Sequence, residues 1–326
     1  MAEWVYEPGI GEDRAALVQD REIVEAAIEL PGLRAGSVAE GRLTEILVPG
    51  RRGLVATAAG DVLVEPLPPA LSKGRAVRVE ILREAVPEAG RPKLPKGAIT
   101  DAEARPGPAL AERVGGTAPA RPHAGDPFEE AGWTELLEQA ASGEIPFPGG
   151  ALRMSLTPAM TLFDVDGPAA PAELALAGAR AAARSIRRMA IAGSIGIDLP
   201  TLASRSDRQR VAAAFDEILP QPFERTAVNG FGFLQVVRRR ERPSLPEILR
   251  SDPAGAAARA LLRRAERQTG AGERLLIAAP AVVARLESEP GWIEELQRRI
   301  GAPVRLQGQP GLAISAGHVQ CAFAPR

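Results

Sequence analysis

The sequence is poor in the residues that build disulfide frameworks and zinc sites. Its 326 residues include one cysteine, Cys321, and two histidines, His123 and His318. A single cysteine excludes an intramolecular disulfide framework and any zinc site that needs several cysteines. The two histidines lie far apart in the sequence, so neither a zinc enzyme nor a Ser-His-Asp hydrolase is expected.

Aromatic residues and long apolar segments are also scarce. Aromatic side chains make up 4% of the sequence, and none occurs between residues 7 and 127. No apolar segment reaches the roughly 18 residues of a membrane span, and the N-terminus lacks the basic and apolar segments of a signal peptide. These absences predict a soluble, cytoplasmic protein with no membrane partner.

The sequence does contain enough apolar material for more than one core. Hydrophobic residues make up 45% of the chain, and its length allows two or three domains of about 100–200 residues each. The formal net charge of −1 argues against a polycationic nucleic-acid binder, although a local basic surface is sufficient for binding RNA. Almost all basic residues are arginines, since the lysines are only Lys73, Lys93 and Lys96.

The order of apolar, turn and charged segments predicts an α/β fold with an inserted small β-barrel. Residues 1–35 alternate like a pair of strands, and 36–95 hold short strands separated by Pro-Gly, Ala-Gly and Pro-Pro turns, which is typical of a small barrel. Residues 96–130 show no periodicity and are interpreted as a linker. A mixed α/β domain is expected at 131–251 and a small α/β C-terminal domain at 252–326.

Two apolar strands of the larger α/β domain end on carboxylates. Asp164 and Asp166 end the segment Thr-Leu-Phe-Asp-Val-Asp, and Asp198 ends Ile-Gly-Ile-Asp. If these strands are neighbours, three carboxylates meet in one cleft, and clustered carboxylates imply a hard divalent cation such as Mg²⁺. Such a site would support phosphoryl chemistry. The structural alternative is that these aspartates only cap the turns after their strands.

Arginines concentrate close to these acidic strands in the sequence. The segment 237–242 contains four arginines and could hold phosphates through bidentate contacts. A second group lies on both sides of the strand that ends at Asp198: Arg184, Arg187, Arg188, Arg205, Arg208 and Arg210. Either group could form a phosphate-binding rim, and the alternative for both is a solvated surface.

The motifs of this domain together resemble the ribonuclease E/G family of RNA-cleaving endonucleases. The resemblance begins at Gly149-Gly150 and continues through Met-Thr-Leu-Phe-Asp-Val-Asp (160–166) and Ile-Gly-Ile-Asp-Leu (195–199). It ends at Asn-Gly-Phe-Gly-Phe-Leu-Gln-Val-Val-Arg-Arg-Arg-Glu-Arg-Pro-Ser-Leu (229–245). The motifs follow the family's order and spacing. The resemblance implies that the barrel is an S1-type OB barrel and that 131–251 is the catalytic domain.

The activity that this resemblance implies is Mg²⁺-assisted hydrolysis of single-stranded RNA, which leaves a 5′-phosphate and a 3′-hydroxyl. Asp164 and Asp198 match the family's metal-binding aspartates, and Asp166 matches a site-lining position where the family usually has Asn. Phe231 and Gly232 match the Phe-Gly pair that lines the RNA path. The arginines expected to bind RNA are Arg187, Arg188, Arg238 and Arg240.

The sequence also departs from the family. The cysteine pair of the family's zinc link is absent, so no zinc-linked tetramer is expected and a homodimer stays open. The segment between barrel and catalytic domain is too short for the family's 5′-end sensor. Gly230 stands where the family has Arg, and Thr201 stands where a second Asp follows the strand. These two departures favour an alternative, a catalytically weak or inactive RNA-binding relative.

A second resemblance is weaker. Phe-Asp-Val-Asp-Gly is similar to the nucleophile motif of haloacid-dehalogenase phosphatases, in which the first Asp attacks phosphate and the second is the acid/base. That motif normally continues with Thr, whereas Pro168 follows here. The phosphate-binding Lys of that family has no counterpart either, because no lysine follows Lys96. A phosphatase is therefore the less favoured alternative.

Overall fold

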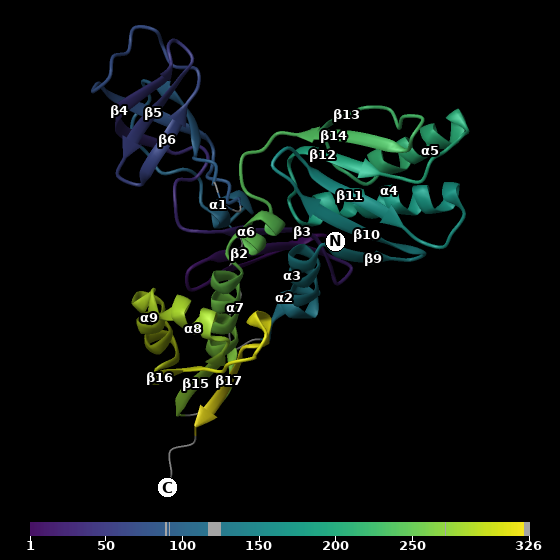
Figure 1. Ribbon diagram of the computed structural model, residues 1–326. Coiled ribbons are helices and arrows are strands. Elements are labelled where there is room, and N and C mark those ends of the chain that lie inside the picture. The colour runs from purple at the N-terminus through teal and green to yellow at the C-terminus, as the bar shows by residue number, and fades with distance from the viewer. Residues whose placement is uncertain (89, 91, 117–124, 271, 323–326) are drawn as a thin grey trace.

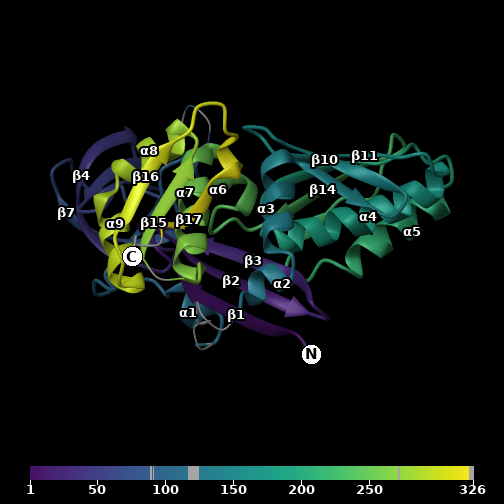
Figure 2. The same ribbon diagram turned by 90° about the horizontal axis from the view of Figure 1, so that it is seen from below.

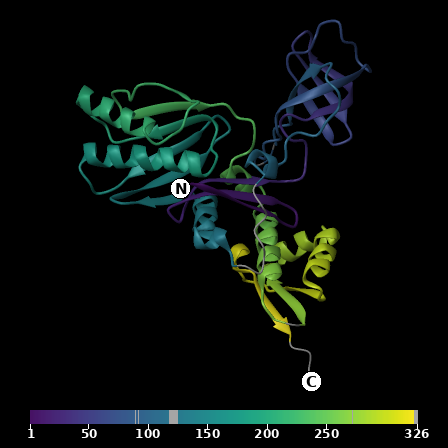
Figure 3. The ribbon, with the colours of Figure 1, turned by 180° about the vertical axis from the view of Figure 1, so that it is seen from behind.

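A computed structural model describes residues 1–88, 90, 92–116, 125–270 and 272–322, so His123 of the predicted linker lies outside the described residues. Its centre is an antiparallel sheet of three strands, β1 (Glu3–Pro8), β2 (Asp13–Gln19) and β3 (Glu22–Glu29), in that order. This sheet lies between a barrel, a larger sheet and a C-terminal α/β domain, as the views from front and back agree (Figures 1 and 3). The predicted strand pair is therefore a sheet of three strands.

The inserted barrel is closed and has five strands. Its members are β4 (Val38–Val48), β5 (Arg52–Thr57), β6 (Gly60–Val64), β7 (Ala76–Arg83) and β8 (Lys96–Thr100), in the closed order β4-β5-β6-β8-β7. Alternate apolar residues fill the interior, and Leu43, Val55 and Val79 are completely buried. The predicted linker thus begins inside the barrel, because β8 is needed to join the free edges of β6 and β7.

Two further described parts of the predicted linker, 101–116 and 125–130, also contain helices of the fold. After α1 (Leu110–Arg113), the chain forms α2 (Pro127–Glu130), whose cap residue Asp126 accepts a hydrogen bond from the amide of Phe128 at 3.1 Å. The Phe128 ring packs edge-on against Trp133 of α3 (Trp133–Ser142), with centroids 5.2 Å apart, and the Arg14 guanidinium lies 4.0 Å from the Phe128 centroid. This cluster joins the N-terminal sheet to the larger α/β domain.

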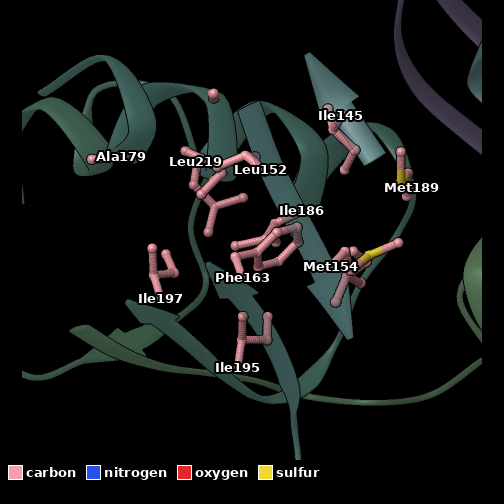
Figure 4. Close-up of a cluster of buried hydrophobic side chains, with 14 of the residues drawn as sticks. Ile145, Leu152, Met154, Phe163, Ala179, Ile186, Met189, Ile195, Ile197 and Leu219 are labelled. Carbon is pink, nitrogen blue, oxygen red and sulfur yellow. The ribbon is translucent and has the colours of Figure 1, made fainter. Parts of the chain in front are cut away.

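The larger α/β domain is built on a sheet with the order β13-β14-β12-β11-β10-β9. Its strands are β9 (Glu144–Phe147), β10 (Gly150–Leu156), β11 (Thr161–Asp166), β12 (Gly193–Asp198), β13 (Glu224–Arg225) and β14 (Phe233–Arg238). Helices α4 (Pro171–Arg188) and α5 (Arg205–Asp216) cover one face of this sheet (Figure 2). The buried residues Phe163, Ile186 and Ile197 meet between the sheet and these helices (Figure 4).

The C-terminal domain is a small sheet flanked by helices. The chain leaves β14 through α6 (Leu245–Ser251) and enters α7 (Pro253–Arg267). The sheet has the order β16-β15-β17, and the elements are β15 (Glu273–Ala278), α8 (Pro280–Glu287), α9 (Pro290–Ile300), β16 (Val304–Gly308), a short 3-10 turn (Ile314–Ala316) and β17 (His318–Ala322). The predicted α/β fold with an inserted barrel is confirmed.

A buried ionic cluster attaches this domain to the N-terminal sheet. Glu12, which is 5% exposed, accepts a hydrogen bond from Arg259 at 2.6 Å and another from Arg263 on the next turn of α7. Glu7 pairs with Arg14 at 2.6 Å in the same region. Among the described residues, no helix combines the length and the apolar character that crossing a membrane requires.

Candidate functional site

The acidic strand ends arise from the alternation of side chains along β11 and β12. Phe163 and Val165 of β11, and Ile197 of β12, are buried on the helix-covered face. Successive side chains of a strand point to opposite faces, so Asp164 and Asp198 point to the face that the helices leave open. Both aspartates are exposed, as the same alternation requires.

The two aspartates are register partners. Strands β11 and β12 are parallel, and Asp164 pairs with Asp198 across them. The row continues in both directions, because Asp164 also faces Arg153 of β10 and Asp198 faces Phe233 of β14. Paired residues of neighbouring strands share one face of a sheet and lie about 4.8 Å apart. The row therefore brings a cation, two carboxylates and an aromatic ring together on the open face.

This pair fits the ligand chemistry of Mg²⁺. Magnesium prefers oxygen ligands and keeps several waters, so one or two direct carboxylates are sufficient. Asp164 and Asp198 supply two carboxylates from adjacent strands, and their exposure leaves room for bound water. We conclude that these two residues could hold one magnesium ion between them.

The predicted cluster of three carboxylates is not formed. Among the described residues, no group of three or more His, Cys, Asp or Glu side chains is arranged to hold a metal ion. Asp166 lies two residues beyond Asp164, faces Ala151 of β10, and forms an ion pair with Arg153 at 3.5 Å. Since β12 ends at Asp198, it has no residue opposite Asp166. The prediction that three carboxylates meet was wrong for this reason.

The loop before β14 presents an aromatic ring beside this edge. Phe231 is 83% exposed. The loop is held by Asn229, whose side-chain oxygen accepts hydrogen bonds from the amides of Phe231 at 2.9 Å and Phe233 at 3.0 Å. Gly232 adopts φ +93°, and a Cβ there would collide with the carbonyl oxygen of Leu199. Glycine is therefore required where this loop crosses the end of β12.

A second aromatic ring, which the sequence motifs alone did not single out, lies on the open face. A Cβ placed on Gly196 would lie 2.5 Å from Cζ of Phe233 and 2.7 Å from Cδ2 of Leu162. The Phe233 ring thus lies over the glycine, next to Leu162. The sequence signal is the alternation along β12, which places Gly196 on the same face as Asp198; Phe233 reaches this face as the register partner of Asp198.

Thr201 and Gly230, the two positions where the sequence departs from the family, also lie at this loop. The Thr201 hydroxyl donates a hydrogen bond to the carbonyl oxygen of Phe231 at 3.3 Å. Gly230 is exposed, and a Cβ on it would meet no atom of the described residues within 4 Å. The loop is thus tied to the end of β12, with open space around Gly230.

Arg238 and Arg240 lie far from the aspartates. Strand β14 runs antiparallel to β12, so that Arg238 faces Gly193 while Phe233 faces Asp198. Arg238 donates to the carbonyl oxygen of Ile191 at 3.0 Å, and burial lowers its pKa. Arg240 donates to the carbonyl oxygen of Ala192 at 2.9 Å. Both guanidiniums therefore connect the chain at the opposite end of the strands, and RNA binding by them stays a prediction.

Arg187 and Arg188 are also used within the fold. Both belong to α4, which covers the other face of the sheet. Arg187 pairs with Glu25 of the N-terminal sheet at 2.7 Å. Arg188 donates to the side-chain oxygen of Gln139, and its pKa is lowered by burial. The structure does not bring these two arginines to the aspartate pair, because the sheet lies between them.

A comparison of the chain with models of known protein families and with curated proteins finds no match. The family resemblance therefore stands on the motifs themselves, and the function is inferred from them and from the geometry of the site.

Proposed function

We propose that the protein is a Mg²⁺-dependent endoribonuclease that cleaves single-stranded RNA, as its resemblance to the ribonuclease E/G family implies. The observation that carries this proposal is the register pairing of Asp164 with Asp198 on an exposed sheet face. The pair lies at the strand edge where Phe231 and Phe233 emerge. A carboxylate pair alone suits many metal enzymes, whereas its aromatic neighbours favour a substrate with bases.

The reaction is hydrolysis of a phosphodiester. A magnesium ion bound by Asp164 and Asp198 would stabilise charge on the attacked phosphate and lower the pKa of a bound water. Water adds to phosphorus and the bond from phosphorus to the 3′-oxygen breaks, which yields a 5′-phosphate and a 3′-hydroxyl. The two aspartates would hold this ion at the ends of β11 and β12, where an extended chain can approach.

The aromatic rings give the site its preference for single strands. Every base has a flat face that stacks on an aromatic ring, at about 1–3 kcal/mol per base, but only an unpaired base has that face free. Phe231 offers an almost fully exposed ring, and Phe233 lies along the same row as the aspartates. Bases stacked here would place the adjacent phosphate over the carboxylate pair.

Cleavage of a labelled oligouridylate over a range of Mg²⁺ concentrations tests the proposal. Asp198→Asn and Asp164→Asn should each lower the cleavage rate by about 100-fold or more, because several kcal/mol of charge stabilisation are lost. Asp61→Asn, at an exposed strand position of the barrel, is the matched control and should leave the rate unchanged. Undiminished cleavage by Asp198→Asn would show that the catalytic assignment is wrong.

The same assay separates the alternatives. An RNA-binding protein without cleavage is favoured by Gly230 and Thr201, which stand where the family has Arg and Asp. It would bind the oligouridylate and leave it intact at every Mg²⁺ concentration. A phosphatase that uses Asp164 and Asp166 would release phosphate from a small monoester and leave RNA untouched. The ion pair of Asp166 with Arg153 disfavours this acid/base role.

A further inference from the structure

A basic cleft of about 740 Å³ lies between the barrel and the larger sheet. Its walls on the barrel side are the end of β7, the segment after it and the start of β8. On the sheet side they are the turn between β10 and β11, the starts of β11 and β12, the segment just after β14, and α6. Two acidic residues of the described chain, Glu88 and Glu247, line it. The basic residues that line it, among those described, are Arg83, Lys93, Lys96, Arg239, Arg240 and Arg250.

The two walls are held together by direct contacts. The amide of Glu84, just after β7, donates to the carbonyl oxygen of Glu241 at 2.8 Å. Arg242 pairs with the Glu84 carboxylate at 3.2 Å. Both contacts lie where the chain passes from β14 to α6, between the barrel and the larger sheet (Figure 1). Contacts between the barrel and the larger sheet therefore hold the two walls of the cleft together.

Carboxylates pair with four of these six basic residues, and no ion pair is formed by Arg83 or Arg250 with a described carboxylate. Lys93 pairs with Glu88 and Lys96 with Glu65. Arg239 pairs with Glu241 at 3.3 Å and Arg240 with Glu247 at 3.1 Å. Arg83 donates to the carbonyl oxygen of Leu94 at 2.8 Å, and its Nε atom is buried with no hydrogen-bond partner among the described residues. Burial lowers the pKa of Arg83 and the charge of Arg240 lowers it further, while Glu88 and Glu247 raise it. The unfilled Nε donor of Arg83, in a cleft where Arg83 and Arg250 form no ion pair with a described carboxylate, is a favourable place for an anion.

The cleft lies at the starts of β11 and β12, and the aspartate pair lies toward their other ends. Ser194 of β12 lines the cleft and shares the face of Asp198, because an even number of positions separates them on the strand. Asp198 is four positions after Ser194 on β12, which is about 13 Å at roughly 3.3 Å per residue. Gly196, covered by the Phe233 ring, lies midway along this path. An extended nucleic-acid strand along the face would meet positive charge, an aromatic ring and the carboxylates in turn.

We propose that this cleft binds backbone phosphates of the same single-stranded RNA that reaches Asp164 and Asp198. The inference rests on the proposed function, because it assigns the second contact of that substrate. The protein would then bind RNA at a site separate from the metal site. The affinity for RNA and the rate of cleavage would therefore depend on different residues. It also predicts that the affinity falls with salt, because binding of phosphates releases counterions.

The test measures binding without cleavage, by fluorescence anisotropy of a labelled oligouridylate in EDTA across a salt series. The variant is Lys93→Ala with Arg239→Ala, whose side chains are 37% and 74% exposed and so can be removed without unfolding the protein. We expect the affinity to fall by about 10-fold and the salt slope to fall by about 0.7 for each phosphate that is no longer bound. Arg305→Ala is the matched control, because this arginine is 71% exposed on β16 and also pairs with one surface carboxylate.

The outcomes of this test separate the two proposals. Unchanged affinity and salt slope in the double variant would overturn the cleft assignment and leave the nuclease proposal standing. If Asp198→Asn cleaves normally while the double variant binds more weakly, the nuclease proposal fails and the cleft assignment holds. In a second variant, Arg83→Gln, the salt slope should fall as well, since it removes the guanidinium whose unfilled Nε donor lines the cleft.

Discussion

Asp164 and Asp198 face each other across a parallel strand pair, and the helix that connects their strands makes this possible. Helix α4 carries the chain from the end of β11 back to the start of β12. The carboxyl ends of both strands therefore meet at one edge of the sheet, which is where α/β folds place their sites. Antiparallel β14 then brings Phe233 to the same row from the other direction.

Phe231 should contribute to RNA binding without contributing to stability. Its ring is 83% exposed, so Phe231→Ala removes little buried surface. The loss of one stacked base should weaken binding of oligouridylate by about 1–3 kcal/mol, as measured by anisotropy in EDTA. Ile314→Ala in the C-terminal domain, at an apolar side chain that is 42% exposed, serves as control. Equal affinity of Phe231→Ala and the native protein would remove this ring from the proposed RNA path.

The acidic strands illustrate what the sequence could predict. Apolar runs that end on Asp164 and Asp198 indicate buried strands, and the alternation of side chains then determines the open face. The third carboxylate could not be placed in this way. Whether Asp166 meets another strand depends on where β12 stops, and the position of Arg153 depends on the pairing of β10. Both are properties of the register between strands rather than of one strand.

The contacts of the arginines and the structure of the predicted linker also depend on pairing between strands, which the sequence alone does not give. The run of arginines in the sequence does not show which groups Arg238 and Arg240 contact. The carbonyl oxygens of Ile191 and Ala192 become their partners only when β14 pairs with β12. Strand β8 is five residues long, and turn-forming residues lie close to it in the sequence. Its alternating pattern is therefore too short to be recognised as a strand. It is a strand because the barrel offers two free edges.

Glu65 should make the stability of the barrel depend on pH in the acidic range. It pairs with Lys96 of β8 at 2.9 Å and with Arg52 of β5 at 3.0 Å. These hydrogen bonds, first that of Lys96, lower its pKa from 4.5 to about 2. A depressed carboxyl pKa stabilises the folded state above the unfolded-state pKa, and this contribution is lost as pH falls from 4.5 toward about 2.

Urea unfolding at a series of pH values measures this effect. Glu65→Gln should lower stability near neutral pH and flatten the decline between 4.5 and about 2. Glu45→Gln, at an exposed position of β4, is the matched control. An unaltered pH profile in Glu65→Gln would show that the ion pairs across β5 and β8 do not stabilise the barrel.

Glu12 should be essential for holding the C-terminal domain against the N-terminal sheet. Its carboxylate is buried and accepts from both Arg259 and Arg263. Glu12→Gln leaves two buried guanidiniums without this counter-charge, and removal of one partner from a buried ion pair costs about 3–5 kcal/mol. The free energy of unfolding in urea should fall by that amount. Glu294→Gln, at an exposed position of α9, should leave it unchanged, and an equally small effect at Glu12 would contradict the prediction.

Gly230 offers the sharpest test of the family resemblance, because the structure leaves space for the missing side chain. A Cβ at this position meets no atom of the described residues within 4 Å, so Gly230→Arg should fold normally. A guanidinium in this loop, next to exposed Phe231, would donate charge-assisted hydrogen bonds to a phosphate of the bound RNA. Such bonds contribute about 1.5–3 kcal/mol each, which corresponds to a cleavage rate raised by about 10- to 100-fold. Gly230→Ala separates this effect from any change in the backbone and should leave the rate unaltered. If Gly230→Arg cleaves no faster than Gly230→Ala, the loop does not approach the scissile phosphate, and the RNA must cross the sheet along another line.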